Sequence, residues 1–271
     1  MPEGHVLHRL AQRIGELFDG HPVQVSSPQG RFSESAALVD GSTLRNAEAW
    51  GKHLFIDFDA PIPTEVLHIH LGLIGSLGIA PTAPAIGQVR VRICDGQWAA
   101  DLRGPQLCRL ITVEQKALAT QKLGADPLRA DADPERTWQR VHRSARPIAA
   151  LLMDQSMFAG VGNIYRAEVL FRNHIDPHCP GRQLHRESFE AIWADLVALM
   201  AIGVRDGRID TVRPEHSPEA MHRPPRVDAH GGEVYVYRRE GQPCLVCGAP
   251  VRHEVLSGRQ LFWCAPCQRQ H

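Results

Sequence analysis

The stretches Cys244-Leu245-Val246-Cys247 and Cys264-Ala265-Pro266-Cys267, separated by 16 residues, decide the fold near the end of this 271-residue chain. Each Cys-x2-Cys turn presents two sulfur atoms to one tetrahedral ion, and four thiolates at about 2.3 Å close the coordination shell of Zn²⁺. The spacing between the pairs lies in the range of four-thiolate zinc sites. We therefore predict one structural zinc ion, and His253 stays open as an alternative ligand. The predicted ligands are Cys244, Cys247, Cys264 and Cys267.

The residues between the two cysteine pairs predict a β-hairpin. Residues 251–256 and 260–263 have the composition of strands, and Ser257-Gly258-Arg259 supplies the turn. Zinc would clamp this hairpin at its base. The chain has seven cysteines, and an odd number without an export signal argues against a disulfide framework. We expect the other three cysteines to be small buried apolar residues.

The composition is that of an ordinary globular protein, with 43% hydrophobic and 22% charged residues. It excludes wholesale disorder and the collagen-like and coiled-coil classes. No stretch reaches the roughly 18 uninterrupted apolar residues of a transmembrane helix, and the N-terminus lacks the pattern of a secretory signal. We therefore expect a cytoplasmic protein that does not enter a membrane. Thirty basic residues balance 30 acidic ones, so a nucleic-acid binder would have to gather its arginines locally.

Upstream of the cysteines, the pattern of apolar residues alternates between helical and strand-like. Residues 4–18 have helical periodicity, whereas 22–112 consist of short apolar runs broken by Gly and Pro, which predicts an antiparallel β-sandwich or barrel. Helical patterns return at 134–142, 147–155, 163–173 and 186–202. Residues 203–230 are rich in Arg, Pro, Gly and His without a period, and we expect a mobile loop there. The chain is thus predicted to be an α+β protein.

The N-terminal residues Pro2 and Glu3 are candidates for chemistry. Removal of Met1 before Pro would leave a secondary amine, and an α-amino group titrates at about pH 8, so about a tenth is unprotonated at pH 7. Such an amine can attack a carbonyl carbon to form a Schiff base, and the Glu3 carboxyl is suited to proton transfer. The alternatives are that Met-Pro is an ordinary start and that Glu3 only complements a helix dipole.

Two further residues stand at positions where chemistry is plausible. Asn163 follows Gly160-Val161-Gly162 at the start of a predicted helix. It could be an ordinary N-cap, which is the favoured interpretation of this residue alone, or it could help a helix N-terminus to bind phosphate. Lys52 is one of three lysines among the 30 basic residues, and a lysine can donate a proton where an arginine stays charged.

Three landmarks together resemble the formamidopyrimidine-DNA glycosylase / endonuclease VIII family. They are Pro2-Glu3-Gly4, the junction Gly160-x-Gly162-Asn163-Ile164-Tyr165, and the four-cysteine hairpin with Arg259. Each motif is moderately specific, but their order and spacing over residues 2–267 are highly specific. The resemblance implies an N-terminal antiparallel β-sandwich with flanking helices, then a helical domain with a helix-two-turn-helix and a zinc finger. Double-stranded DNA with damaged bases or abasic sites would lie in the cleft between them.

Together with this resemblance, the patterns place domain boundaries along the chain. We expect a catalytic β-sandwich domain over residues 1–113, a linker over 114–133, a helical helix-two-turn-helix domain over 134–232 and the zinc hairpin over 233–271. We also expect a monomer.

The same resemblance implies a mechanism of base excision and strand cleavage. The enzyme would flip a damaged base out of the duplex, and the amine of Pro2 would attack C1′ of its nucleoside. Glu3 matches the residue that gives a proton to the opening sugar. The Schiff base would make the 2′-hydrogens acidic, so that β,δ-elimination cleaves the strand. Lys52, at the start of a strand, matches a lysine that contacts phosphate and assists proton transfer.

The resemblance also implies how DNA is held. Asn163 and Arg259 match residues that grip phosphates around the lesion. The segment His70-Leu71-Gly72-Leu73-Ile74-Gly75 matches the family's intercalation loop, so Leu73 is a candidate wedge, with a core β residue as the alternative. His70 is expected to touch phosphate, and Arg103 is expected to contact the orphaned base.

The start Pro2-Glu3-Gly4-His5-Val6 resembles the endonuclease VIII branch, whereas the formamidopyrimidine branch usually opens Pro-Glu-Leu-Pro-Glu-Val. We therefore expect oxidised pyrimidines and abasic sites as substrates, with hydantoin-type purine products as further ones and the 203–230 loop deciding how 8-oxoguanine is handled. Two other classes stay open: a catalytically silent, zinc-dependent protein that binds lesion DNA, and a zinc-stabilised protein–protein module.

Overall fold

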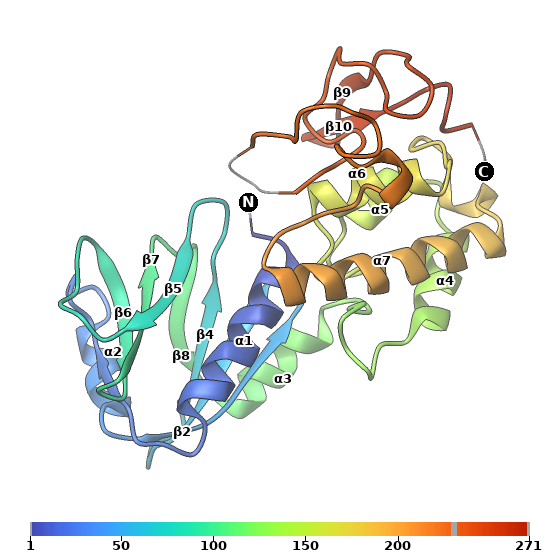
Figure 1. Ribbon diagram of the computed structural model, residues 1–271. Coiled ribbons are helices and arrows are strands. Elements are labelled where there is room, and N and C mark those ends of the chain that lie inside the picture. Colours follow the sequence, from blue (N-terminus) through green and yellow to red (C-terminus); the bar gives the residue numbers. More distant parts are fainter. Residues whose placement is uncertain (1, 229–231, 270–271) are drawn as a thin grey trace. The chain divides into compact units, whose positions relative to one another are not determined.

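The computed structural model describes residues 2–228 and 232–269, so Met1 lies outside the described residues. The chain divides into two compact units, Met1–Lys122 and Leu123–His271, which Figure 1 shows from blue to green and from green to red. In the described ranges, no helix combines the length and the apolar character needed to cross a bilayer.

The first unit contains two four-stranded antiparallel sheets with flanking helices. Its strands are β1 (Gln24–Ser26), β2 (Thr43–Trp50), β3 (His53–Asp59), β4 (Val66–His70), β5 (Ser76–Pro81), β6 (Val89–Cys94), β7 (Trp98–Arg103) and β8 (Leu107–Ile111). Its helices are α1 (Gly4–Phe18), α2 (Ser33–Val39) and α3 (Val113–Gln121). One sheet has the order β1-β6-β7-β5 and the other β2-β3-β4-β8. This confirms the predicted β-sandwich.

One apolar core joins both sheets to α1. Leu54 and Ile56 of β3 belong to the same buried cluster as Ile93 of β6. Helix α1 adds Leu7 and Ile14, which lie on one face because they are two helical turns apart. The core therefore fixes the helix whose first turn follows the N-terminal residues.

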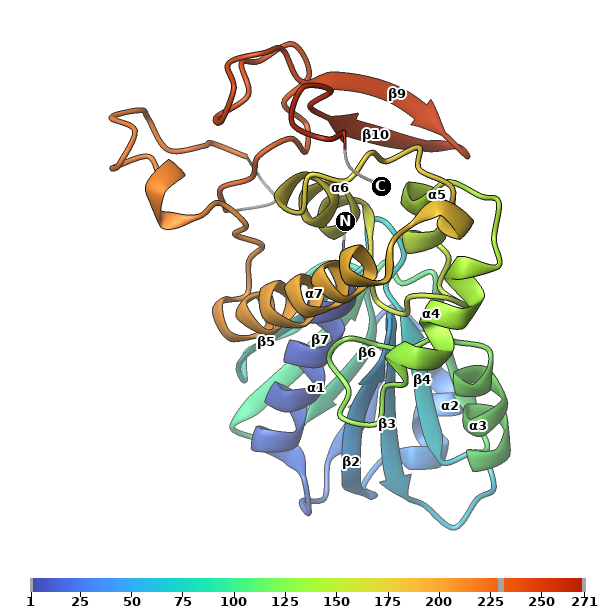
Figure 2. The same cartoon turned by 90° about the vertical axis from the view of Figure 1, so that its right-hand side faces the viewer.

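The other face of the β2-β3-β4-β8 sheet is covered at one end by α3 (Figure 2). Side chains alternate along a strand, so His53, Phe55 and Asp57 share this second face. Phe55 packs with Val66 in a small cluster of its own. Lys116 of α3 donates to Asp57 at 2.8 Å, so an ion pair fixes the helix over this end of the sheet.

The segment 114–133, expected to be a linker, begins within helix α3. A capping box starts this helix: the Gln115 N–H donates to Thr112 Oγ1 at 3.2 Å, and the Thr112 N–H donates to Gln115 Oε1 at 3.1 Å. None of its residues is fully buried, so the sequence carries no apolar stripe that would have revealed the helix.

The second unit combines helices with a C-terminal hairpin. The helices are α4 (Pro134–His142), α5 (Ile148–Leu152), α6 (Asn163–Arg172) and α7 (Arg186–Asp206), with 3-10 turns η1 (Gly181–Gln183) and η2 (Pro214–His216), and the hairpin is β9 (Arg252–Leu256) and β10 (Arg259–Trp263). All four helices lie where their periodicity predicted them, although α5 ends at Leu152 instead of residue 155 and α7 runs on to Asp206. Leu170 of α6, Leu196 of α7 and Leu261 of β10 belong to one buried cluster, so helices and hairpin share a core.

A buried carboxylate and a partly buried ion pair hold the second unit together. Glu168 of α6 is fully buried and accepts hydrogen bonds from Thr211 Oγ1 and from the three backbone N–H groups of residues 235–237, at 2.6 to 2.9 Å. Arg172 of α6 forms a two-bond pair with Asp195 of α7 at 2.7 and 2.8 Å. Glu168 thereby ties two distant segments of the chain to α6.

Candidate functional site

The four C-terminal cysteines come together as the spacing predicted. Their sulfur atoms all lie within 4.8 Å of one another, with 3.4 Å between Cys247 and Cys264 and 3.9 Å between Cys244 and Cys267. Four sulfurs bound to one zinc ion at about 2.3 Å would be about 3.8 Å apart. The residues present therefore fit a structural zinc ion, which confirms the predicted cofactor.

Zinc binding would change the protonation of these thiols. Burial raises the pKa of Cys264 to about 12, and burial together with the neighbouring thiols raises the pKa of Cys267. Both side chains would be neutral thiols at pH 7 without a metal, and zinc supplies the charge that makes thiolates stable there. His253 lies elsewhere, with Nδ1 3.3 Å from Glu240 Oε1 and Nε2 bonded to Gln260, so the alternative histidine ligand is not supported.

The hairpin that the cysteines clamp has a two-residue turn. Ser257 and Gly258 have φ angles of 50° and 74°, as expected for the turn that matches the twist of paired strands. Arg259 is the first residue of β10, opposite Leu256, and its side chain is exposed. The turn is thus one residue shorter than predicted, and Arg259 lies on a paired strand directly beside it.

Asn163 is linked to this hairpin through Arg166, a residue that the sequence patterns did not single out. Asn163 is the first residue of α6, with Gly162 as N-cap, so it is not the cap itself. The Arg166 side chain is almost fully buried and donates both to Asn163 Oδ1 and to the carbonyl oxygen of Gln260, the latter at 2.6 Å. Asn163 and the strand that begins with Arg259 are therefore held together by one guanidinium.

Pro2 and Glu3 lie at the start of α1. Glu3 occupies the N-cap position, yet its side chain makes no capping hydrogen bond and is fully buried, whereas Pro2 is half-buried. A fully buried carboxyl directly after Pro2 is unusual because glutamate side chains are mostly exposed in folded proteins. The dipole-complementing interpretation of Glu3 does not account for this burial, because an exposed carboxylate would serve that purpose.

The remaining candidates of the first unit cluster at one end of two strands. Lys52 lies in the tight turn between β2 and β3, and His70 ends β4. His70 Nδ1 accepts a hydrogen bond from the Gly72 N–H at 3.0 Å. Burial and the charge of Lys52 lower the pKa of His70. His53, the first residue of β3, pairs with His70 across the sheet and was not among the predicted residues.

Leu73, the expected wedge, is exposed, whereas Arg103, expected to contact the orphaned base, forms hydrogen bonds within the protein. Leu73, in the turn after β4, is 63% exposed and its neighbour Ile74 is 89% exposed, so the core alternative for Leu73 is excluded. Arg103 ends β7 and donates to Asp101 Oδ2 at 3.0 Å and to the carbonyl of Ile86 at 3.1 Å. Those bonds fix the Arg103 side chain.

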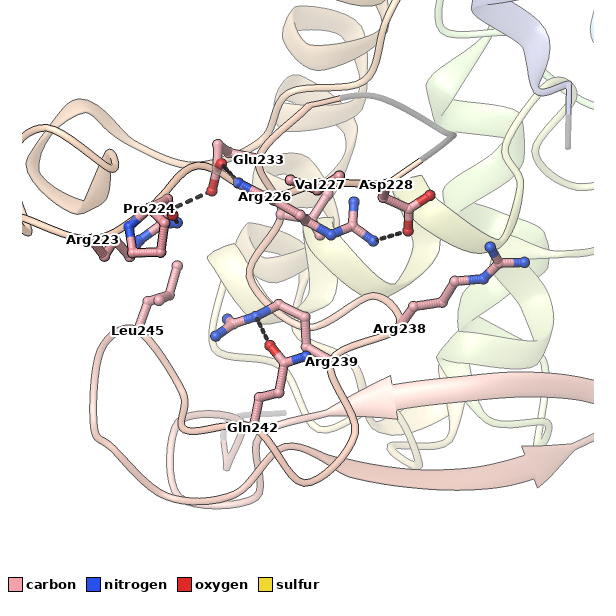
Figure 3. A pocket seen from close by; sticks show the side chains of 11 residues that line it. Arg223, Pro224, Arg226, Val227, Asp228, Glu233, Arg238, Arg239, Gln242 and Leu245 are labelled. Atoms are coloured by element: carbon pink, nitrogen blue, oxygen red, sulfur yellow. Dashed lines mark hydrogen bonds and ion pairs between the residues drawn. The ribbon is translucent and has the colours of Figure 1, made fainter.

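Arginines of the 203–230 segment and its neighbours are engaged in internal contacts. They line a cavity of about 350 Å³ in the second unit (Figure 3). Arg223 pairs with Glu233 and Arg226 pairs with Asp228, each at 2.6 Å. Arg239 donates to backbone carbonyls, including that of Tyr235 at 2.6 Å. These side chains therefore hold the segment in place.

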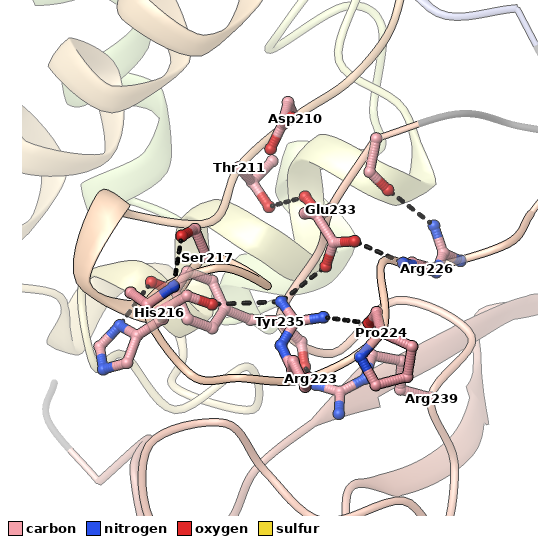
Figure 4. A network of polar contacts seen from close by, with 12 residues as sticks. Asp210, Thr211, His216, Ser217, Arg223, Pro224, Arg226, Glu233, Tyr235 and Arg239 are labelled. Carbon is pink, nitrogen blue, oxygen red and sulfur yellow. Dashed lines mark hydrogen bonds and ion pairs between the residues drawn. The ribbon is translucent and has the colours of Figure 1, made fainter.

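A second set of contacts anchors the same segment around Tyr235 (Figure 4). The Tyr235 hydroxyl accepts from the Arg213 N–H at 3.0 Å and lies 3.0 Å from His216 Nδ1. Arg223 donates to the carbonyl of His216 at 3.1 Å. Among its described residues, the segment has only η2 as regular structure beyond Asp206. Its expected mobility stays a prediction, and residues 229–231 lie outside the described part of the chain.

Comparison with known proteins identifies the family. The formamidopyrimidine-DNA glycosylase N-terminal domain matches residues 1–106, the formamidopyrimidine-DNA glycosylase H2TH domain matches 123–213, and the zinc finger found in FPG and IleRS matches 241–270. The chain is 50% identical to "Endonuclease 8 1" of Mycobacterium tuberculosis, over 99% of this chain and 100% of that protein. It is 31% identical to a formamidopyrimidine-DNA glycosylase of Xanthomonas campestris, over 97% of this chain and 94% of that protein.

A solved structure shares the whole fold. The MutM (Fpg) protein of Thermus thermophilus superposes with a TM-score of 0.75 at 27% identity, and the match covers 100% of both chains. The order of the three family domains along the sequence also agrees with the order of the elements described above. The chain therefore belongs to the formamidopyrimidine-DNA glycosylase / endonuclease VIII family of DNA glycosylases, which act in base excision repair of damaged bases.

Proposed function

We propose that this protein is a bifunctional enzyme that removes oxidised bases from DNA and then cleaves the strand at the abasic site. The observation that carries the proposal is the fully buried, non-capping carboxyl of Glu3 directly after Pro2. A carboxyl held in this way next to a terminal amine can transfer protons at that amine. The whole-chain likeness to an endonuclease 8 supports the same interpretation.

The chemistry would begin at the nitrogen of Pro2 after removal of Met1. Its lone pair attacks C1′ of the damaged nucleoside, the bond from C1′ to the base breaks, and a proton from Glu3 assists opening of the sugar. The resulting Schiff base acidifies the 2′-hydrogens. A general base can then remove one of these protons, and the 3′-phosphate is expelled. A second elimination expels the 5′-phosphate. The amine suits this role because a terminal amine is more often unprotonated at pH 7 than a lysine.

Both units would supply groups that hold DNA. In the first unit we assign phosphate contact and proton transfer to Lys52, phosphate contact to His70 and the wedge to Leu73, whose exposure suits insertion between bases. In the second unit we assign phosphate contacts to Asn163 and Arg259. We assign contact with the orphaned base to Arg103, whose bonds to Asp101 and Ile86 would have to rearrange for it.

Oxidised pyrimidines are the proposed substrates, with abasic sites as well. The start Pro2-Glu3-Gly4 and the 50% identity to a protein named endonuclease 8 support this choice. Duplexes that each carry one lesion (thymine glycol, dihydrouracil, 5-hydroxycytosine or 8-oxoguanine) test it. We expect single-turnover excision to be faster for the three pyrimidines. Fastest excision of 8-oxoguanine would contradict the choice. We also propose that the protein acts as a monomer in the cytoplasm.

Borohydride trapping on an abasic duplex tests the reaction itself. We expect wild-type protein to form a covalent complex and to nick the strand, and Pro2→Gly to diminish both. Pro61→Gly, an exposed proline of the same unit, is the matched control and should behave as wild type. Normal trapping and nicking by Pro2→Gly would overturn the assigned nucleophile. Binding of the abasic duplex by wild type without any trapping would favour the catalytically silent lesion binder.

A further inference from the structure

Three histidines lie together on the second face of the β2-β3-β4-β8 sheet, at the end that carries Lys52. His53 pairs with His70 across the strands, and Phe55 pairs with His68. The ring centroid of His53 lies 5.0 Å from that of His68 and 4.9 Å from that of His70. His68 also stacks on Phe55 at 4.5 Å. Helix α3 covers the opposite end of this face, so the histidines form its other end.

Two of these histidines share one proton. His53 Nδ1 lies 2.9 Å from His68 Nε2, so one nitrogen must donate and the other must accept. Burial, together with the neighbouring cationic groups, lowers the pKa of His68 to about 3 and that of His53 to about 4. Both rings are therefore neutral near pH 7, and each carries one N–H.

The burial of His68 decides which nitrogen carries the shared proton. The His68 side chain is only 2% exposed, and its Nδ1 has no hydrogen-bond partner among residues 2–228 and 232–269. A buried N–H without an acceptor is rarer and more costly than a bare acceptor. His68 therefore carries its proton on Nε2 and donates it to His53 Nδ1. His53 must then carry its own proton on Nε2.

His70 also carries its proton on Nε2, because of a contact with the backbone. The Gly72 backbone N–H can only donate, so His70 Nδ1, which accepts from it at 3.0 Å, has no proton. The neutral His70 ring therefore carries its proton on Nε2. His53 and His70 are both half-buried, and the Nε2 atom of neither ring is among the fully buried side-chain nitrogens that lack a partner in the described part of the chain. Two neutral N–H donors thus lie beside each other; His53 follows Lys52 in sequence, and both rings are close enough to feel its charge.

We propose that His53 presents a second, neutral Nε2–H donor to a DNA phosphodiester, beside the contacts already assigned to His70 and Lys52, and that His68 is a positioning residue that sets the tautomer of His53. This inference rests on the proposed DNA-binding function. Its distinctive consequence concerns salt. A cationic contact releases condensed counterions when it binds phosphate, whereas a neutral donor does not. His53 should therefore add affinity without adding to the salt dependence of binding.

The tautomers can be measured without DNA and without activity. Imidazole nitrogen-15 chemical shifts distinguish a protonated from a bare ring nitrogen in the full-length, zinc-loaded protein. We expect Nε2–H tautomers for His53, His68 and His70 at pH 7, and a mixture of both tautomers for His53 in the variant His68→Phe. A Nδ1–H tautomer of His53 in wild type, or an unchanged His53 in His68→Phe, would overturn the positioning role.

The phosphate contact is tested by binding to a duplex with a tetrahydrofuran abasic analogue, which cannot undergo the reaction. We expect His53→Phe to weaken binding about tenfold, as loss of a hydrogen bond to a charged group does, with no change in the slope of log affinity against log salt. His53→Gln, which keeps an N–H donor, should recover most of the loss. Lys52→Gln should instead lower the slope by about one.

The outcomes separate this inference from the proposed function. Unchanged affinity in His53→Phe, or a salt slope that falls as in Lys52→Gln, would overturn the neutral contact while strand nicking by wild type still supported the proposed function. Failure of wild type to bind any duplex would overturn both. Circular dichroism and the melting temperature of each variant show whether a loss of affinity comes from misfolding. If His53→Phe is misfolded, the contact is tested by His53→Gln, which must bind with nearly wild-type affinity.

Discussion

The two units of this protein hold their phosphate-binding candidates in different ways. In the second unit, Arg259 is exposed beside a tight turn on a hairpin that zinc clamps, and Arg166 ties that hairpin to Asn163. In the first unit, Lys52 and neutral histidines lie at the end of a sheet that has its own apolar core. The difference suggests two ways to prepare a phosphate contact. A metal can fix the hairpin that carries a charged arginine, and burial can keep histidines neutral so that they act as uncharged donors. The first unit should be sensitive to acid and the second to chelation.

Removal of zinc should have the largest effect and should be confined to the second unit. Structural zinc contributes folding free energy to the site that binds it, on the order of 10 kcal/mol in zinc-finger peptides. We expect chelation, or Cys247→Ser, to weaken DNA binding at least tenfold while hydrogen exchange in the first unit stays unchanged. Cys108→Ser, which changes a half-buried thiol outside the cluster, is the control. Unchanged affinity after demonstrated loss of the metal would contradict the hairpin's role.

Glu168→Gln should have the next largest effect, again in the second unit. The carboxylate satisfies four donors, and an amide with one acceptor oxygen leaves some of them without a partner. We expect a loss of roughly 2 to 5 kcal/mol in the free energy of unfolding of this unit, measured by denaturant titration. Glu190→Gln, on the surface of α7, should change it by less than about 0.5 kcal/mol. Equal effects of the two substitutions would refute the clamp.

Acid should destabilise the first unit by a smaller amount. Histidines in an unfolded chain titrate at about 6.5, whereas His53 and His68 titrate with pKa values of about 4 and about 3 in the folded unit. The unfolded state therefore binds more protons as the pH falls, so stability that is present above about pH 6.5 is lost progressively toward pH 4.

Hydrogen exchange of the β3 and β4 amides between pH 7 and pH 5 measures this loss. We expect His68→Phe to reduce the pH dependence, because it removes one of the histidines whose pKa the fold lowers, while His5 and His53 still contribute. His21→Phe replaces an exposed histidine of the same unit and should leave the pH dependence as in wild type. Identical pH profiles for His68→Phe and wild type would show that His68 does not contribute to the loss of stability in acid.

The zinc centre and the helices of the second unit could be predicted because their signals are local. Four cysteines at metal-binding spacing and apolar residues at helical spacing need no information from distant parts of the chain. Helix α3 could not be predicted in this way, because it buries no residue and has no apolar stripe. A turn at Gly51, with φ of 58°, separates β2 from β3, and the apolar pattern over residues 47–58 does not reveal where one strand ends and the next begins.

The candidate site was predictable where a motif carried it and not where contacts between distant residues created it. Pro2, Glu3, Asn163 and the cysteines stand in recognisable motifs. Arg166 gains its role only from a carbonyl 94 positions later in the chain. His53 and His68 meet because two strands pair in one register, which the sequence does not specify. The alternation His68-Ile69-His70 is the one local signal that could have drawn attention to them.

The central claim, that the terminal nitrogen of Pro2 is the nucleophile, is tested most directly by finding the atom that carries the adduct. Wild-type protein is reacted with an abasic duplex under borohydride, digested with protease and nuclease, and sequenced by mass spectrometry. The account predicts that Met1 is absent and that the reduced sugar remnant is attached to the nitrogen of Pro2. A remnant attached to Lys52 or to either of the other two lysines, or a retained Met1 in the trapped protein, would contradict it.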